Sequence, residues 1–374
     1  MKIKAAVLRE MGLPRPYAES KPLSIEELEL EGPGDGEVLV KVKAAGLCHS
    51  DLSVMDGARP RPLPMALGHE AAGEVAEVGA GVVDLKPGDH VVMIFVPSCG
   101  HCLPCAEGRP ALCEPAAVAN GEGRLMSGAR RLSRGSETVN HHMGVSAFAE
   151  YAVVSRHSLV KVDPDIPLEQ AALFGCAVLT GVGATLNTAG VEPGSRVAVI
   201  GLGGVGLNSL LGAVLVGAEQ VVAIDLLDSK LDLARQLGAT DAFKADREDI
   251  VEAVKQVTGG GVDYALEMAG SVPALELAYK ITRRGGTTVT AGLAHPSKQM
   301  SFQAVSLVAE ERTLKGSYIG SCVPLRDIPR FIGLFKKGRL PVDRLMSERI
   351  GFEEINEAFD RLAEGNTVRQ LLIP

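Results

Sequence analysis

The feature that most constrains the fold is a glycine-rich turn between a strand-like run and a helix-like run. Residues 196–200 are rich in valine and isoleucine, and an apolar helical pattern extends to residue 216. The turn between them has the spacing G-x-G-x-x-G and consists of Gly201, Leu202, Gly203, Gly204, Val205 and Gly206. In such a turn the first glycine permits a tight bend, the second lets the backbone approach a pyrophosphate, and the third lets the helix pack closely on the strand. The segment therefore predicts a dinucleotide site at the N-terminus of a helix.

Short β-rich runs and helical runs continue to alternate after this turn. The candidate strands are 220–224, 262–266 and 287–290, and the candidate helices are 228–237 and 273–281. Strands that alternate with helices in this way predict a parallel, doubly wound sheet, which is an α/β fold.

Asp225 is placed to select the cofactor. It ends the candidate strand that follows the turn, 19 residues after Gly206. A carboxylate at this point can accept hydrogen bonds from both ribose hydroxyls, and its charge repels a 2′-phosphate. Leu226 and Leu227 follow, and no arginine does. We therefore expect NAD rather than NADP, with Lys230 either donating to the ribose or lying on the surface of the helix.

The chain before residue 176 has a different character. Frequent Gly and Pro separate short apolar runs, which predicts a compact, irregular β domain. Val38, Val40 and Val42, for example, alternate with other residues directly after a turn at 32–36, as in a half-buried strand. Residues 116–142 are rich in Gly, Ser and Arg and have few long apolar side chains. Such a composition favours a surface loop.

The alternation of strands and helices ends near Gly320, and a tail with two helical segments and a terminal apolar run follows. We expect this tail to rejoin the first domain, so that the α/β domain is an insertion. The predicted β-rich domain consists of residues 1–178 and 320–374, and the predicted α/β domain consists of residues 179–319. A chain of 374 residues is too long for one compact core.

Composition excludes several classes of partner. Hydrophobic residues make up 46% and charged residues 22%, close to the average of globular proteins, so we do not expect disorder. The formal net charge is −8, and no run of Lys or Arg marks a footprint for nucleic acid or anionic lipid. No stretch approaches the roughly 20 apolar residues of a membrane span, and the first residues lack the apolar run of a signal peptide. We expect a small-molecule partner, no nucleic-acid or membrane partner, and a cytoplasmic location.

Four of the seven cysteines crowd into one window with the spacing C-x2-C-x2-C-x7-C. Four thiols this close can surround one tetrahedral ion and leave no open position, which predicts a structural zinc site. An iron–sulfur cluster is the main alternative, but the ferredoxin sequence that opens with C-x2-C-x2-C has its fourth cysteine after only three residues. Disulfides are a third alternative. The four residues are Cys99, Cys102, Cys105 and Cys113.

A second candidate metal site combines residues that are far apart in the sequence. Cys48, His69 and Cys176 would give zinc two thiolates and one imidazole, and a tetrahedral ion would keep its fourth position for a substrate oxygen. Taken singly, each cysteine could be inert core packing. Asp51 follows Cys48 by three residues and could accept the second N–H of His69, which would fix the tautomer of that ring.

Together these motifs resemble those of zinc-dependent alcohol dehydrogenases of the medium-chain dehydrogenase/reductase superfamily. The resemblance covers almost the whole chain and rests on Cys48-His49-Ser50-Asp51, Gly68-His69-Glu70, the four-cysteine window, Gly175-Cys176, the glycine-rich turn and the tail through Arg369. It implies a GroES-like, β-rich catalytic domain that is interrupted by a Rossmann domain. Residues 116–142 resemble the longer loop of the type that is usually dimeric, which implies a homodimer.

The resemblance implies an oxidoreductase that transfers hydride between a primary or secondary alcohol and NAD, with one catalytic and one structural zinc per chain. A thiol-linked formaldehyde dehydrogenase of the same family is the alternative activity. A non-catalytic member that serves as a binding or structural protein is a further alternative. All seven expected metal ligands are present, however, which disfavours a protein without catalysis.

The resemblance also implies roles for single residues. Ser50 is the expected first proton acceptor, and Glu70 is either a carboxylate behind the zinc ligands or a buried acid paired with Arg369 or another cation. The proton relay of the family ends in a histidine where this chain has Ser53, so we expect His49 or bulk water to complete it. The expected cofactor contacts outside the glycine-rich turn are Asp225, Lys230, Leu293 and Arg369. The expected substrate pocket consists of Phe95, His142, Met143, Leu293 and Tyr318.

Overall fold

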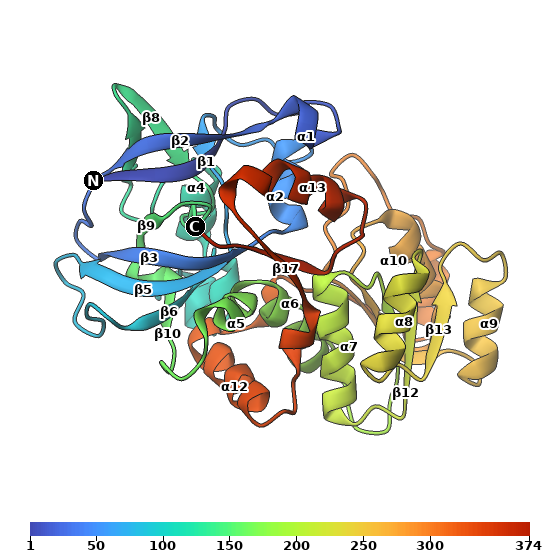
Figure 1. The fold of residues 1–374 in the computed structure, drawn as a ribbon. Helices are drawn as coiled ribbons and strands as arrows, with labels where there is room; N and C mark the ends of the chain where they lie inside the picture. Colours follow the sequence, from blue (N-terminus) through green and yellow to red (C-terminus); the bar gives the residue numbers. More distant parts are fainter. The chain divides into compact units, whose positions relative to one another are not determined.

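The computed structural model describes every residue from Met1 to Pro374, and the chain divides into two compact units. Unit 1 consists of Met1–Cys176, Val323–Ile332 and Asp343–Pro374, and unit 2 consists of Ala177–Cys322 and Gly333–Val342. The β-rich fold and the α/β fold expected from the sequence are both present (Figure 1). The domain boundaries expected at residues 178 and 319 stay a prediction.

Unit 1 contains a closed barrel with the strand order β1-β2-β7-β8-β4. In that order the strands are Lys2–Leu8, Leu23–Leu30, Leu132–Arg134, Glu137–His141 and Met65–Ala66. Successive side chains of a strand point to opposite faces, so every second residue can reach the interior. In β1 these residues are Ile3, Ala5 and Val7, which are buried in one apolar cluster with Leu28 and Leu30 of β2.

Strands β7 and β8 lie in the segment for which composition favoured a surface loop, and that expectation was wrong. Residues 116–142 form most of helix α4 (Glu114–Gly121) and then a hairpin that closes the barrel. The segment has few apolar side chains, but three of them fill the barrel interior. Leu125, Leu132 and Val139 are all buried in the barrel cluster.

A second sheet of unit 1 carries the segments around the predicted metal ligands. Its order is β10-β6-β5-β3-β18-β17, and β9 also pairs with β3. The strands are β3 (Glu37–Gly46), β5 (Ala71–Val78), β6 (His90–Met93), β9 (Tyr151–Ser155), β10 (Leu159–Lys161), β17 (Met346–Ile350) and β18 (Arg369–Leu372). Figure 1 shows β3 and β5 side by side. Leu371 of β18 lies opposite Gly46 of β3, so the tail adds a strand next to the one that leads to Cys48.

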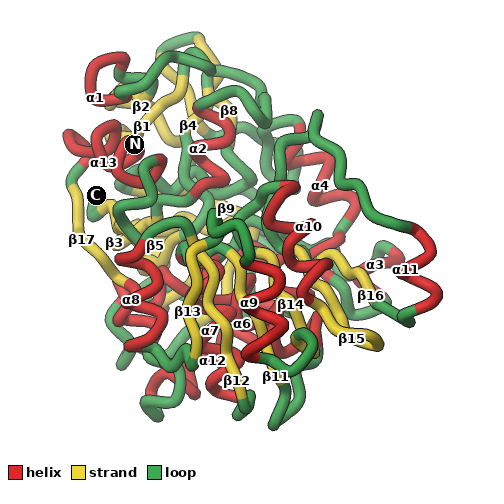
Figure 2. Tube along the Cα trace, turned by 90° about the vertical axis from the view of Figure 1, so that its right-hand side faces the viewer, coloured by secondary structure: helices red, strands yellow, loops and turns green.

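Unit 2 is built on a parallel sheet with the order β13-β12-β11-β14-β15-β16. Figure 2 shows these strands side by side in yellow. In that order they are Asp241–Lys244, Gln220–Asp225, Arg196–Ile200, Val262–Glu267, Thr282–Thr290 and Thr313–Gly316. Every pairing is parallel, and the last four residues of β11 are all buried, as in a strand covered on both faces. The predicted doubly wound sheet is confirmed.

The helices are short. Besides α4, unit 1 contains α1 (Tyr17–Ser20), α2 (His49–Met55), α3 (Leu103–Ala106), α5 (Leu168–Ala172) and α13 (Ile355–Ala363). Unit 2 contains α6 (Ala177–Gly183), α7 (Gly204–Val216), α8 (Asp228–Gln236), α9 (Ile250–Val257), α10 (Val272–Ile281) and α11 (Ala304–Ala309), and α12 (Pro324–Lys336) has residues of both units. None of the helices has the length and apolar composition to cross a membrane alone. One bent pair, Leu168–Gly175 with Ala177–Ala189, would be long and apolar enough by length and composition only.

Candidate metal centres and nucleotide-binding turn

The structure brings the first predicted ligand set together inside unit 1. Cys48 lies between β3 and α2, His69 lies between β4 and β5, and Cys176 follows a short 3-10 helix at Leu173–Gly175. One ligand atom from each of these residues and one from Glu70 all lie within 4.8 Å of one another. Cys48, His69 and Cys176 are 8%, 0% and 5% exposed. Three distant segments therefore place two sulfurs and an imidazole around one buried point.

Gly68 lets the chain turn His69 toward this point. Its φ is +93°, a conformation that residues with a Cβ rarely adopt, and a Cβ would also meet the backbone nitrogen of Phe148. The N–H of Phe148 donates to the carbonyl of Leu67 at 3.0 Å, and the N–H of Ala147 donates to the carbonyl of Gly68 at 3.0 Å. The segment before His69 is thus in direct backbone contact with residues 147–148.

Asp51 orients His69. Nδ1 of His69 lies 3.0 Å from Oδ1 of Asp51, and both side chains are fully buried. With its proton on Nδ1, the ring keeps a free lone pair on Nε2, which is buried and has no hydrogen-bond partner. A buried acceptor without a partner is costly, and a metal ion at this nitrogen would satisfy it. Two thiols and this orphaned imidazole nitrogen fit a zinc ion.

The two thiols of this set differ in proton affinity. The pKa of Cys48 lies well below its ordinary value because Cys176 donates a hydrogen bond to it, an effect stronger than that of burial. The pKa of Cys176 lies well above its ordinary value because its proton is held in the hydrogen bond to Cys48 and because the side chain is buried. Cys48 is therefore the thiolate of the pair, and a bound dication would have to displace the proton of Cys176.

Glu70 is paired with Arg369, and both side chains are buried. The guanidinium donates to both carboxylate oxygens through Nη2 and to the carbonyl of Leu47 through Nη1 at 3.1 Å. Burial raises the pKa of Glu70 to about 7, although Arg369 opposes the shift. The sequence left open whether Glu70 lies behind the ligands or pairs with a cation, and the structure places it in both situations.

Ser50 and His49 open helix α2 directly after Cys48. Sγ of Cys48 lies 3.8 Å from Oγ of Ser50, so the serine hydroxyl is beside the candidate ligand set. His49 is exposed and Ser50 is half-buried. The hydroxyl of Ser53 donates to the backbone carbonyl of His49 at 2.7 Å. Because Ser53 uses its proton within its own helix, it does not extend a path from Ser50.

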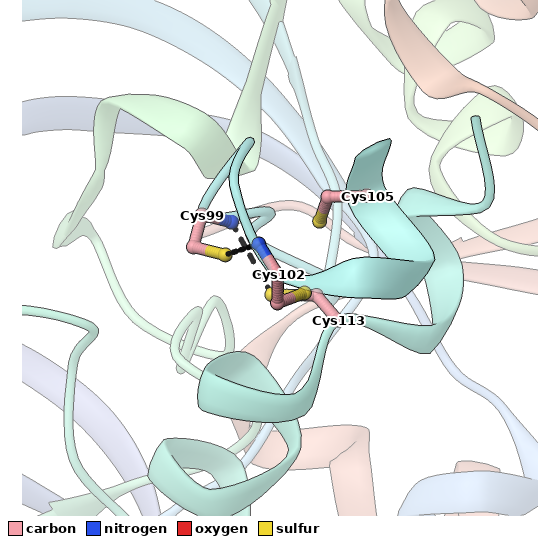
Figure 3. A group of neighbouring side chains, drawn as sticks. All are labelled: Cys99, Cys102, Cys105 and Cys113. Carbon is pink, nitrogen blue, oxygen red and sulfur yellow. Dashed lines mark hydrogen bonds between the residues drawn. The ribbon is translucent and has the colours of Figure 1, made fainter. Parts of the chain in front are cut away.

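The four-cysteine set is assembled in a lobe formed by α3 and a 3-10 helix at Pro110–Leu112. The four sulfurs lie within 4.8 Å of one another and turn toward a common centre (Figure 3). The N–H of Cys99 donates to Sγ of Cys113 at 3.2 Å, and the N–H of Cys102 donates to Sγ of Cys99 at 3.2 Å. Hydrogen bonds from the backbone at His101 and Cys102 lower the pKa of Cys99 to about 6. Thiolates stabilised in this way fit a closed, structural zinc site.

Two of the residues expected in a substrate pocket lie against His69. The rings of Phe95 and His142 stand nearly perpendicular to the His69 ring, with centroids 5.1 Å and 5.7 Å away. Met143 is buried in the same unit. Leu293 and Tyr318 belong to unit 2 and are exposed. The role of all five residues in binding substrate stays a prediction.

The contact between His142 and Asp51 is a feature that sequence reasoning missed. Nδ1 of His142 lies 3.2 Å from Oδ1 of Asp51, so this carboxylate faces two imidazoles. Burial lowers the pKa of His142, although Asp51 opposes the shift. For His69 the balance is reversed, since Asp51 raises its pKa well above the ordinary value in spite of burial. No local spacing marks this contact, because the two residues lie on segments far apart in the sequence.

In unit 2 the glycine-rich turn has the geometry of a phosphate site. Gly203 is the N-cap of α7 and offers no capping side chain, so the first N–H groups of the helix are available to an anion. A Cβ at Gly206 would collide with the carbonyl oxygen of Gly201, whereas a Cβ at Gly203 would meet nothing within 4 Å. The space beside Gly203 is where a pyrophosphate would approach the backbone, so a dinucleotide fits.

Asp225 is fixed beside this turn. Its two oxygens accept the N–H of Leu202 at 2.6 Å and the N–H of Leu227 at 3.0 Å. Lys230 is only 5% exposed, and burial lowers its pKa although Asp225 opposes the shift. The surface position considered for Lys230 is therefore wrong, because its side chain is buried. A contact between Lys230 and a ribose stays a prediction.

Comparison with known proteins agrees with both units. Residues 34–164 match the family described as alcohol dehydrogenase GroES-like domain, and residues 204–337 match the family described as zinc-binding dehydrogenase. The chain is 41% identical over 377 residues to the putative alcohol dehydrogenase D of Mycobacterium tuberculosis, and the match covers 100% of both chains. It is 40% identical over 376 residues to the NDMA-dependent alcohol dehydrogenase of Amycolatopsis methanolica, over 100% of this chain and 99% of that one.

Among solved structures, that of benzyl alcohol dehydrogenase from Acinetobacter calcoaceticus is similar over 100% of this chain and 99% of its own, with a TM-score of 0.93 and 35% identity. The chain therefore belongs to the zinc-dependent alcohol dehydrogenases of the medium-chain dehydrogenase/reductase superfamily. It is an oxidoreductase of alcohols and acts on small molecules. The expected combination of a GroES-like domain with a Rossmann domain is confirmed.

Proposed function

We propose that this chain is an NAD-dependent alcohol dehydrogenase with one catalytic and one structural zinc, which interconverts a primary or secondary alcohol with its aldehyde or ketone. The proposal rests above all on the buried set of Cys48, His69 and Cys176, in which Nε2 of His69 has no hydrogen-bond partner. Three ligands leave one position of a tetrahedral ion for a substrate oxygen, and four ligands leave none. The chemistry therefore belongs to this set, and the four-cysteine set stabilises its lobe.

The buried residues around the open set hold it in one geometry. Cys48, His69 and Cys176 would hold the catalytic zinc, which supplies Lewis-acid chemistry to the oxygen of the alcohol or the carbonyl. Asp51 keeps a proton on Nδ1 of His69, so that Nε2 is offered as a ligand. Glu70 lies next to these ligand atoms with its charge matched by a guanidinium.

Ser50 is the proposed first proton acceptor, because its hydroxyl lies beside Cys48. His49 directly precedes Ser50 in the chain and is exposed, so we propose that it passes the proton to solvent. His49→Gln should change the pH dependence of turnover if His49 takes part. An unchanged pH profile would assign this step to bulk water alone.

NAD is the proposed cofactor. The turn from Gly201 to Gly206 and the first N–H groups of α7 would bind the pyrophosphate. Asp225 would accept the ribose hydroxyls, and its charge would repel the 2′-phosphate of NADP. Lys230, Leu293 and Arg369 are the further proposed contacts. We expect kcat/KM to favour NAD over NADP by about tenfold or more, which corresponds to about 1.4 kcal/mol.

The proposed substrate pocket is mostly apolar or aromatic, which favours alcohols with an apolar substituent. It consists of Phe95, His142, Met143, Leu293 and Tyr318. One similar solved structure is that of a benzyl alcohol dehydrogenase. Benzyl alcohol and a short aliphatic alcohol are therefore the first two substrates to compare.

We also propose a homodimer in the cytoplasm. Strand β16 is the edge of the parallel sheet in unit 2. Val305 and Val308 of α11, which precedes β16, are 67% and 79% exposed. An open sheet edge and exposed valines are features that a second copy of the chain can cover. None of the seven cysteines forms a disulfide bond, which suits a reducing compartment.

A steady-state screen of alcohols and aldehydes with NAD(H) and NADP(H), together with zinc quantification, tests the proposal. We expect about two zinc ions per fully loaded chain and turnover with NAD. Substantially less zinc would contradict one of the two sites. A strict requirement for a low-molecular-weight thiol in formaldehyde oxidation would replace the proposed activity with that of a thiol-linked formaldehyde dehydrogenase.

A further inference from the structure

Two imidazoles share one carboxylate oxygen beside the open ligand set. Oδ1 of Asp51 lies 3.0 Å from Nδ1 of His69 and 3.2 Å from Nδ1 of His142. The backbone N–H of Gly68 also donates to this oxygen, at 3.3 Å. Oδ2, by contrast, is buried and has no hydrogen-bond partner. The interactions of Asp51 are therefore concentrated on one oxygen, for which His69 and His142 compete.

The backbone around His142 holds this ring in place. The N–H of His142 donates to Oγ of Ser146 at 2.8 Å, and that hydroxyl donates to the carbonyl of Ala66 at 2.8 Å. Met143 and Ser146 have φ angles of 52° and 54°, which are uncommon for residues with a side chain and persist where the surroundings fix them. The loop that presents His142 is thus fastened to the segment that leads to His69.

The ring of His142 lacks any other partner for its nitrogens. Both nitrogens are buried without a well-formed hydrogen bond, and the residue is 1% exposed. A buried N–H that stays unpaired costs free energy. Asp51 is the acceptor within reach, and a small rotation of the ring would turn the 3.2 Å approach into a hydrogen bond.

We propose that His142 is a positioning residue that donates a hydrogen bond to Oδ1 of Asp51. This second hydrogen bond weakens the one between Nδ1 of His69 and the same oxygen. A carboxylate oxygen that accepts a second hydrogen bond has less negative charge to offer the first donor. His69 then donates less electron density through Nε2, so the site releases its metal more readily. This inference rests on the proposed catalytic zinc at Cys48, His69 and Cys176.

Zinc release from the holoenzyme in excess chelator tests this role. His142→Phe keeps a ring without a donor, whereas the amide nitrogen of His142→Asn can take the place of Nδ1. We expect release from the catalytic site to be about two- to tenfold slower in His142→Phe and close to the wild-type rate in His142→Asn. Asp51→Asn should act in the opposite direction and weaken zinc binding by roughly 10- to 100-fold, as loss of a direct partner of a ligand does. Damage to packing in His142→Phe would speed zinc release, whereas loss of the proposed hydrogen bond should slow it. The direction of the change therefore separates a packing defect from the proposed role.

The absorption spectrum of enzyme with cobalt(II) in the catalytic site is a second readout, and it should shift in His142→Phe and return in His142→Asn. Release from the four-cysteine site is the internal control and should be the same in all variants. If the wild type binds zinc only at the four-cysteine site, the proposed function fails. The role of His142 is overturned if the wild type binds both ions but His142→Phe releases the catalytic zinc at the wild-type rate or faster. It is also overturned if His142→Asn does not restore the wild-type rate.

Discussion

The two ligand sets of unit 1 are held in place by different means. The four cysteines come from one short window, and N–H groups of that same window donate to Sγ of Cys99 and Cys113. The open set comes from three separate segments, and its geometry depends on Asp51 and, through Glu70, on Arg369. A closed site can be specified locally because the loop wraps around its ion. A site with a free position lacks such a wrapping loop, so distant residues must hold its ligands.

Burial differs in the same way. The ligands of the open set are all buried, whereas Cys99, Cys102 and Cys105 are only partly covered and Cys113 alone is buried. Charged groups in a dry site interact strongly, and a missing partner is correspondingly costly. Variants of the open set should therefore have larger effects than variants of the lobe.

The largest effect is expected where the open set depends on a distant residue. Arg369→Leu leaves the carboxylate of Glu70 buried without its partner, which should cost about 3–5 kcal/mol of unfolding free energy. Urea unfolding measures the loss. Arg349→Leu removes a more exposed pair with Glu169 and is the matched control, with an expected cost of no more than about 1 kcal/mol. Equal losses in the two variants would break the comparison.

Cys48→Ala should lower kcat/KM by at least about 100-fold, because a metal ion contributes several kcal/mol to such a reaction. Zinc content should fall by one ion per chain while the four-cysteine site stays loaded. Cys322→Ala is the control, since Cys322 is buried in unit 2 and belongs to neither set. Activity of Cys48→Ala near the wild-type level would mean that the chemistry takes place elsewhere.

Cys105→Ser should open the lobe and leave the open set intact. We expect the loss of one zinc ion, faster proteolysis between residues 99 and 113, and a fall in Tm of about 2–4 °C for each kcal/mol lost. Alcohol oxidation at low temperature should persist. Loss of both zinc ions would instead show that the two sites are coupled.

The smallest effect concerns thiol reactivity after zinc has been removed. Cys99 has a pKa of about 6, and burial raises the pKa of Cys105 to about 12. Alkylation at a pH slightly above 7 should therefore modify Cys99 first, and its rate should fall as the pH drops through about 6 and the thiolate is protonated. Cys48 is also a thiolate but is buried and should react more slowly. Peptide mapping by mass spectrometry gives the order, and faster modification of Cys48 would contradict its burial.

Much of the fold and of the ligand sets could be predicted because it depends on residue type and short-range spacing. The glycine-rich turn required a strand before it and a helix after it, and β11 and α7 are those elements. The four-cysteine window needed no information from outside itself. In the same way, the spacing from Cys48 to Asp51 and the position of His69 were enough to propose that the carboxylate orients the ring.

Contacts between distant segments escaped prediction. The hairpin within 116–142 depends on a barrel interior that other strands build, so composition alone suggested a loop. His142 was expected in a substrate pocket, and nothing in its neighbours indicates that Asp51 lies 3.2 Å away. Both are consequences of three-dimensional packing, which a local pattern does not record.

The pairing of Glu70 with Arg369 spans 299 residues of the sequence, and this separation orders the events of biosynthesis. When Cys48, His69 and Glu70 leave the ribosome, the strand that carries Arg369 has not yet been made. At about 5–20 residues per second, the delay is roughly 15–60 s. During this time the carboxylate lacks its cation and the sheet lacks β18. A zinc ion that arrived then would meet an incomplete set of partners, so we expect the proposed catalytic site to be completed only after translation of the tail.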